Sequence, residues 1–397
     1  MNELTVESIT ELITNFANFV SETVSLTIAQ DRHLVYNQFL DSEAGFNSDR
    51  LAFLDKGIKN SPYHSQVENY PDYLTEQPSL AIGGVPSYPQ VGELPTIDEQ
   101  ALEFLHPDIK QACICIGGTE GGPFKARWLG REALSRGEFW STTKIIPILN
   151  VICSLKTDIN GCEIRGDDKS FGISELMEDV FTYAEKIGSS NSIGAMFKRF
   201  QTFADLEAWL KGITGTPHTR FRGMYGEAPL IANPEVVKSD EVLLTAAPET
   251  EKGENSVTAY DLTRIISMVG WHYHLPPTAQ LPGSSWDNLK PFIPALGKDT
   301  GRYLDVAIEK LGIENSISKP VILSKIGFGY TSWRQRTELT YTCFTQFHYQ
   351  EKPRSVAMTL RCAKALGDGD REAIEVDARM AAEVTEILRR LVTGELQ

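Results

Sequence analysis

Residues 139–150 read FWSTTKIIPILN, a stretch in which one serine and one lysine stand at the start of an otherwise apolar run. The mostly apolar residues from Ser141 to about Leu155 are typical of a helix buried on nearly all sides. Pro147 favours a helix start near Ser141, because a proline early in a helix loses little, whereas one deep inside costs about 3 kcal/mol or more. Lys144 is then predicted one turn after Ser141 on the same helix face, near the positive end of the helix dipole.

This pairing predicts an activated serine. A serine hydroxyl is a weak nucleophile until a base takes its proton, and a lysine can be that base only when burial destabilises its ammonium form. The S-x-x-K pattern is weakly specific by itself, since the chain holds a second match at Ser316 to Lys319. There the following proline favours extended chain rather than a helix.

Two further short motifs follow in order. Residues 189–191 form an S-x-N triplet between two helical segments, and residues 325–327 form a K-x-G on a predicted strand near the C-terminal end. Around them, ACICIGGTEGG followed by FKARWLGREAL predicts a β-hairpin, and helical patterns dominate from about 170 to 310. Strand patterns return after residue 319, and the chain closes on an amphipathic helix. Strands at both ends with helices between them predict a mixed α/β domain whose sheet is assembled from its two ends.

In this order and context the sequence resembles the serine penicillin-recognising enzymes, and among them the class A β-lactamases, whose signature is S-x-x-K, S-D-N and K-T-G. The resemblance covers about residues 108–397. It implies a β-lactamase/transpeptidase-like fold, an antiparallel sheet flanked by helices with an all-helical half inserted. We expect an N-terminal extension over 1–105, made of an amphipathic helix over residues 4–26 and an irregular wrapping segment from about 33 to 105. A β-lactamase-like domain is expected over 106–397. The expected division of that domain is a sheet half (106–140 and 316–397) and a helical half (141–315).

Carried over residue by residue, the resemblance implies Ser141 as the acylated nucleophile and Lys144 as its proton acceptor. Ser189 would relay a proton to the leaving group, and Asn191 would hydrogen-bond an acyl-side amide. Lys325 would bridge Ser189 and an anionic group of the substrate.

The remaining implied roles belong to one strand and one loop. Gly327 would let substrate backbone lie against the strand, and the N–H groups of Ser141 and Phe328 would form the oxyanion hole. Glu227, in RFRGMYGEAPLIANP, is the best candidate for the carboxylate that activates water to release the acyl group. An exposed loop carboxylate without a catalytic role is the alternative for Glu227.

The sequence departs from the class A pattern at two positions. Ser190 replaces the aspartate of S-D-N, a mild change. Ile326 replaces the hydroxyl residue of K-T-G, and an isoleucine cannot donate a hydrogen bond to a substrate carboxylate. Arg334 or Arg336 would be a substitute anion site, although a solvated surface arginine is the simpler interpretation of each.

Composition limits the partners. A net charge of −15 and a pI near 5.0 disfavour nucleic acid as a partner. No membrane span and no secretion signal are visible, so we expect a cytoplasmic protein.

The six cysteines are scattered, with Cys113 and Cys115 on one face of a strand, and are interpreted as buried thiols. His272 and His274 have no third ligand nearby, so we expect no metal and no cofactor.

Three functions remain open. The first is a serine hydrolase that cleaves an ester, amide or peptide-like acyl substrate other than a β-lactam. The second is a true class A β-lactamase or D,D-peptidase, and the third is a catalytically weak relative that uses its cleft for binding. The natural acyl group and the oligomeric state do not follow from the sequence.

Overall fold

Six strands from the two ends of the chain form one central sheet in the computed structural model, which describes residues 31–43, 58–80, 84–155, 157–331, 334–350 and 352–396. All neighbours are antiparallel except β1, which runs parallel to β3. The predicted hairpin is confirmed as β2 and β3. In spatial order the strands are β1 (Ile97–Asp98), β3 (Lys125–Arg131), β2 (Ile109–Gly118), β13 (Lys352–Lys364), β12 (Arg336–Tyr349) and β11 (Ile317–Thr331).

Both faces of this sheet are buried, and alternate residues of each strand serve different cores. Cys113 and Cys115 point into one hydrophobic cluster while Ile114 points into the other, as the two-residue repeat of a strand requires. The prediction that the two thiols share a face is therefore confirmed. All six cysteines are buried and free of disulfides.

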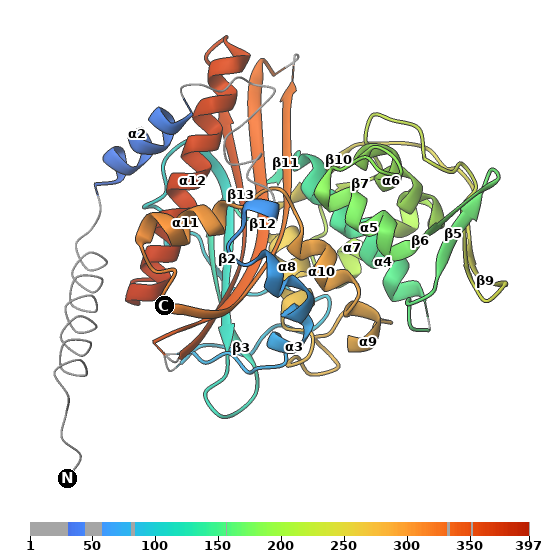
Figure 1. Cartoon of the computed structure of the whole chain (residues 1–397), viewed down its shortest axis with the longest axis horizontal. Helices are drawn as coiled ribbons and strands as arrows, with labels where there is room; N and C mark the ends of the chain where they lie inside the picture. Colours follow the sequence, from blue (N-terminus) through green and yellow to red (C-terminus); the bar gives the residue numbers. More distant parts are fainter. Residues whose placement is uncertain are drawn as a thin grey trace.

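One face of the sheet is covered by α11 (Tyr303–Leu311) and α12 (Gly369–Thr393), and α2 (Arg32–Ser42) packs against α12 (Figure 1). The closing helix predicted from the sequence is α12, and its apolar stripe is buried against the strands and α11. Asp368 caps it by accepting a hydrogen bond from the Arg371 N–H, and Gly394 ends it with φ 80°, a left-handed conformation that suits glycine.

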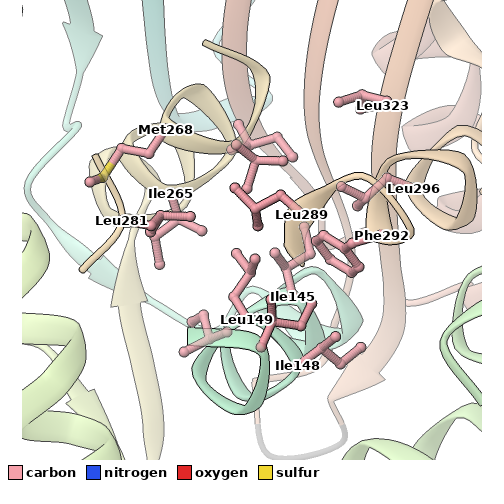
Figure 2. Close-up of a cluster of buried hydrophobic side chains, with 14 of the residues drawn as sticks. Ile145, Ile148, Leu149, Ile265, Met268, Leu281, Leu289, Phe292, Leu296 and Leu323 are labelled. Carbon is pink, nitrogen blue, oxygen red and sulfur yellow. The ribbon is translucent and has the colours of Figure 1, made fainter. Parts of the chain in front are cut away.

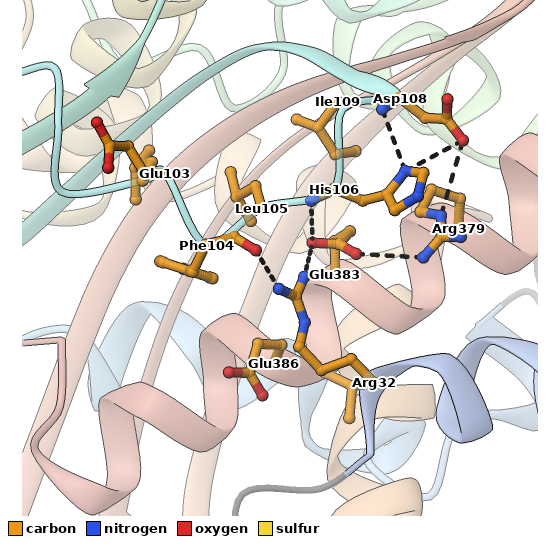
Figure 3. Close-up of polar contacts among 12 residues, drawn as sticks. Arg32, Glu103, Phe104, Leu105, His106, Asp108, Ile109, Arg379, Glu383 and Glu386 are labelled. Atoms are coloured by element: carbon orange, nitrogen blue, oxygen red, sulfur yellow. Dashed lines mark hydrogen bonds and ion pairs between the residues drawn. The ribbon is translucent and has the colours of Figure 1, made fainter.

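The helix α2 lies within the stretch that was expected to be irregular. Asp31 caps it, and its apolar side chains Val35, Tyr36 and Phe39 pack into the core beneath α12. Arg32 of α2 pairs with the buried Glu383 of α12 at 2.5 Å and also donates to the carbonyl of Phe104 (Figure 3). The helix predicted over residues 4–26 lies outside the described residues.

The other face carries the inserted half, whose helices are α4 (Ile145–Ser154), α5 (Ile173–Thr182), α6 (Ser190–Phe197), α7 (Phe203–Thr214), α8 (Ala259–Gly270), α9 (Trp286–Leu289) and α10 (Phe292–Gly297). Its helical character is as predicted, but it is not all-helical. One small sheet lies within it, formed by β6 (Lys169–Gly172), β5 (Glu163–Gly166), β8 (Glu235–Lys238) and β9 (Glu241–Thr245). A second joins β10 (Asn255–Thr258) and β7 (Arg220–Phe221) of this half to β4 (Arg136–Gly137), which lies just before it in the chain. Their strands are two to five residues long, too short for a clear two-residue repeat in the sequence.

The helix α4 is the centre of the core between the two halves. Ile145, Ile148 and Leu149 point at side chains from α8, α9, α10 and β11, as Figure 2 shows. Fully burying each such side chain contributes about 1.5–3 kcal/mol. The core therefore fixes the start of α4, where the serine and lysine of the opening motif stand.

Short elements complete the described chain. They are α3 (Tyr70–Tyr73) and the 3₁₀ turns η1 (Ile58–Asn60), η2 (His64–Asn69), η3 (Trp140–Lys144) and η4 (Lys198–Phe200). No helix in the described ranges is both long enough and apolar enough to cross a membrane.

Candidate active site

Ser141 and Lys144 meet at the entrance to α4. The 3₁₀ turn η3 runs directly into α4, so Pro147 occupies the third helical position, where no backbone donor is needed. The Lys144 Nζ lies 2.8 Å from the Ser141 Oγ. The geometry predicted for S-x-x-K is thus present, one turn apart on one face.

Lys144 is fully buried, and its amine has only neutral hydrogen-bond partners among the described residues. Besides Ser141, it contacts the Ser190 Oγ at 3.0 Å and the Asn191 Oδ1 at 2.7 Å. Burial, and to a smaller extent the nearby positive charge of Lys325, lower the pKa of Lys144 to about 6, while Glu227 acts in the opposite direction. Near neutral pH a large share of this amine is unprotonated and able to accept a proton.

The S-x-N triplet approaches Lys144 at the N-terminus of α6, but with different contacts from those expected. Ser189 is the N-cap of α6, where its hydroxyl accepts from the Ser192 N–H and donates to the Glu227 carboxylate. Ser190, not Ser189, supplies the hydroxyl beside Lys144, and it also donates to the Val180 carbonyl. The short spacing could not distinguish these two hydroxyls, because both belong to one helical turn.

Glu227 does lie at this site. It accepts from Ser189 and, at 3.0 Å, from the Asn191 Nδ2, so Asn191 joins Glu227 to Lys144. The buried Lys198 supports the loop that carries Glu227. Its amine donates to the Gly223 carbonyl at 2.6 Å and to the Asn255 Oδ1 at 2.9 Å. Burial holds the pKa of Lys198 well below its usual range.

Lys325 is near the site but turned away from Ser189. Its ammonium is fully buried, pairs with Asp299 at 3.4 Å and lies 3.8 Å from the centre of the Tyr183 ring. The expected bridge from Lys325 to Ser189 is therefore absent from the contacts of the described residues. Asp299 was missed from the sequence because it is a lone carboxylate in LGKDTGRY, far from any of the motifs.

Gly327 is a glycine because the protein's own backbone needs the space. A Cβ there would lie 2.7 Å from the Ser141 N and 2.9 Å from the Phe139 O. The Thr340 hydroxyl reinforces this contact by donating to the carbonyls of Phe139 and Gly327. Strand β11 therefore packs closely against η3 at this glycine. The predicted approach of a substrate backbone to Gly327 stays a prediction.

The two expected oxyanion donors lie on these neighbouring segments. The strand β11 is an edge strand, and the Ile326 carbonyl accepts from the Tyr183 hydroxyl at 3.1 Å on its open side. Because backbone groups alternate in direction along a strand, the Phe328 N–H points to that same open side. The Ser141 N–H comes from the adjoining turn, which packs on β11 at Gly327.

The residue before Ser141 has an unusual backbone. Trp140 has φ 49°, in the left-handed region that a tryptophan rarely adopts. Its ring packs on Gly329, where a Cβ would come within 2.4 Å of it, and its Nε1 donates to the buried Glu338 at 3.0 Å. These contacts hold Trp140 in a conformation that costs of order 1–3 kcal/mol.

A cavity of about 810 Å³ opens beside Ser141. That volume lies within the usual range for small-molecule sites. Among the described residues that line it, Glu138 is the one charged side chain, and much of the rest is aromatic or amide. The lining residues are Glu138, Trp140, Ser141, Thr182, Tyr183, Asn191, Met224, Tyr225, Gly226, Asn255, Thr300, Ile326 and Phe328.

The two arginines considered as anion sites are paired with carboxylates. Arg334 contacts Glu138 at 2.6 Å and Glu338 at 3.1 Å, and Arg336 contacts Glu338 at 2.5 Å. The second S-x-x-K match is not a helix, since residues 317–319 belong to β11 and Lys319 pairs with Glu76.

Of the comparisons with known proteins, only the one with solved structures found similar chains. No family model and no curated protein matches the chain. Among solved structures it is similar to a class A β-lactamase from Mycobacterium abscessus (14% identity, 75% of this chain and 99% of that chain, TM-score 0.45). It is also similar to a β-lactamase from Xanthomonas campestris (15%, 71% and 91%, TM-score 0.41) and one from Desulfarculus baarsii (14%, 71% and 93%, TM-score 0.42).

Proposed function

We propose that this chain is a serine hydrolase that forms an acyl-enzyme on Ser141 with an ester or amide that is not primarily a β-lactam. The observation that carries the proposal is the 2.8 Å contact between the Ser141 hydroxyl and a buried lysine whose pKa is lowered to about 6. A nucleophile beside a base that is neutral at working pH is the requirement for covalent acyl transfer.

In the acylation step the Ser141 Oγ attacks the acyl carbon while its proton passes to the Lys144 Nζ. The carbonyl electron pair moves onto oxygen, where the N–H groups of Ser141 and Phe328 stabilise the negative charge. When this intermediate collapses, the bond to the leaving group breaks. The alkoxide or amine departs with the proton that Lys144 returns, and Lys144 is neutral again.

In the release step Glu227 takes a proton from the attacking water. The bond between the acyl carbon and the Ser141 oxygen then breaks, and the proton held by Glu227 finally restores the serine hydroxyl. The contacts of Glu227 with Ser189 and Asn191 support this role. They hold its carboxylate beside the Asn191 amide, whose oxygen accepts from Lys144. Turnover rather than permanent acylation is the expected result.

Two other functions are weighed against the same contacts. A β-lactamase or D,D-peptidase would need a cation for the substrate carboxylate, and the pairing of Lys325 with Asp299 disfavours it. A protein that only binds in the cleft would have no use for a lowered lysine pKa beside the serine. These observations favour the hydrolase.

The test is covalent labelling with a fluorescent penicillin and a fluorophosphonate, followed by mass spectrometry of the labelled peptide. We expect wild type to be modified on Ser141 by at least one probe, and Ser141→Ala by neither. Hydrolysis of short acyl esters without turnover of a chromogenic cephalosporin would support the proposed substrate class. Rapid cephalosporin turnover would favour the β-lactamase, and unmodified Ser141 at high probe concentration would exclude both enzymes.

A further inference from the structure

Among the described residues that line the cleft, none at the end formed by β11 carries a positive charge. Lys325 is the nearest cation to Ile326 and Phe328 along the strand, yet its side chain is completely buried. On its inner side it pairs with Asp299, which is also completely buried and accepts from the Ser324 hydroxyl and the Gly301 N–H. An ammonium held in this way has its charge balanced within the protein.

Tyr183 separates Lys325 from the cleft. Its ring lines the cavity and lies 3.8 Å from the Lys325 Nζ, a cation–π distance. Its hydroxyl donates to the Ile326 carbonyl at 3.1 Å, which fixes the ring over the lysine from the edge of the sheet. A ligand in the cavity therefore meets the phenol ring before it meets the ammonium.

The remaining charges around the cavity do not attract an anion either. Glu138 is negative and is paired with Arg334, whose guanidinium also contacts Glu338. Ile326 and Thr300 line the β11 end, where neither residue carries a positive charge. An anionic group bound there would lose its hydration and meet no accessible cation in exchange.

We propose that the cleft selects acyl substrates without a negative charge near the scissile bond, and that Tyr183 is the residue that determines this selectivity. As a substrate preference the inference rests on the acyl-enzyme function proposed above, and it names the class of substrate: neutral esters or amides with an apolar or aromatic group. Removing the Tyr183 ring opens a path to Lys325 and should admit a carboxylate.

A matched ligand pair tests the charge preference without requiring turnover. Benzylpenicillin and its methyl ester differ by one negative charge, and their equilibrium binding to Ser141→Ala can be measured by calorimetry. We expect the methyl ester to bind roughly tenfold more tightly, a difference that corresponds to about 1.4 kcal/mol. Adding Tyr183→Ala should reduce or reverse this ratio, whereas adding Tyr183→Phe, which keeps the ring over Lys325, should preserve most of it.

Equal binding of the two ligands to Ser141→Ala, including no detectable binding of either, would overturn the proposal. So would tighter binding of the carboxylate, or a ratio that Tyr183→Ala leaves unchanged. The outcome is independent of the labelling of Ser141 in wild type. If the ester binds more tightly but Ser141 is never acylated, the hydrolase proposal is refuted and the charge preference is supported. If Ser141 is acylated but the ester does not bind more tightly, the charge preference is refuted and the hydrolase proposal is supported.

Discussion

The amine of Lys144 is surrounded by uncharged hydrogen-bond partners, with the rings of Tyr183 and Tyr225 5.9 and 5.4 Å away. No carboxylate contacts it directly among the described residues, so burial is not offset by an ion pair. This is why the pKa of Lys144 falls to about 6 from an ordinary value of 10.5. The same feature that would prepare Lys144 for its proposed role as base destabilises the fold.

The cost of burying Lys144 should depend on pH. Between about pH 6 and 10.5 the unfolded lysine binds a proton that the folded one does not, so the stability of the folded state rises with pH across this window. Lys144→Met removes this dependence. We expect the melting temperature of the variant, relative to wild type, to be highest at and below about pH 6 and to fall as the pH approaches 10.5. A difference that stays constant over calorimetric scans across this range would contradict the assigned protonation state.

Glu227→Gln should separate acylation from release. Without the carboxylate we expect the acyl group to remain on Ser141, with release slowed about 10²–10⁴-fold, the usual contribution of a general base. Because Glu227 raises the pKa of Lys144, the variant should also shift the pH midpoint of acylation to a lower value. Intact-protein mass spectrometry during turnover gives the first result, and pH-dependent labelling gives the second. Glu227→Asp keeps the charge and should leave the midpoint near that of wild type.

At the residue scale the sequence predicted the contact between Ser141 and Lys144, because their spacing is local. Three residues apart in a helical turn, Ser141 and Lys144 can meet only in one way. Which of two adjacent hydroxyls faces Lys144, and which carboxylate pairs with Lys325, depends on segments far apart in the chain. Asp299 and Tyr183 carry no motif of their own, so neither contact was predictable.

The contact between η3 and β11 is the element-scale feature on which the site depends. The turn brings the Ser141 N–H against the strand at Gly327, and Trp140 packs its ring on Gly329 two residues on. Both glycines lie on the same face of β11, as the two-residue repeat of a strand requires. The backbone of Ser141 is thereby held beside the backbone of β11, as the proposed oxyanion hole requires.

Gly327→Ala should disrupt this contact. Its Cβ would lie 2.6 Å from the Thr340 Oγ1 and 2.7 Å from the Ser141 N, so the strand or the turn must move. We expect acylation of Ser141 to fall about 10²–10³-fold, as when an oxyanion donor is lost. The matched control is Gly212→Ala in α7, where a Cβ meets nothing within 4 Å. Probe labelling should be unchanged in this control, and equal labelling of the two variants would argue against the contact.

At the element scale the long patterns were predicted and the short ones were not. The hairpin β2–β3 and the helix α12 are long enough to repeat their apolar pattern several times, so the sequence shows which of their residues are buried. The helix α2 has no clear apolar stripe in the sequence, since Leu34 is exposed while the neighbouring Val35 and Tyr36 are buried. The strands of the two small sheets are too short to carry a pattern.

For the molecule as a whole, the sheet joins distant parts of the chain, and α2 packs against α12 on the outside of the sheet. Glu383 of α12 is almost completely buried and accepts from Arg32 and from the His106 N–H (Figure 3). It therefore links α2, the segment before β2 and α12. That the extension ends near residue 105 stays a prediction.

Arg32→Ala should loosen α2 without affecting the site. We expect the loss of this charged hydrogen bond to lower the free energy of unfolding by about 1.5–3 kcal/mol, because the buried Glu383 loses a partner. We expect faster hydrogen exchange in the amides of residues 32–42 and unchanged labelling of Ser141. Arg136→Ala, which removes an exposed pair with Glu254, is the control and should change neither. Slower acylation in Arg32→Ala would show that α2 influences the cleft.

The pH dependence of Ser141 acylation, measured by stopped-flow labelling of wild type and Lys144→Met with one acyl probe, tests the central claim most directly. If neutral Lys144 is the base, the wild-type rate rises with pH to a midpoint near 6 and then levels off. In Lys144→Met the rate falls about 10²–10⁴-fold and loses this midpoint. Equal rates in the two proteins, or a wild-type midpoint near the ordinary lysine value of 10.5, would contradict it.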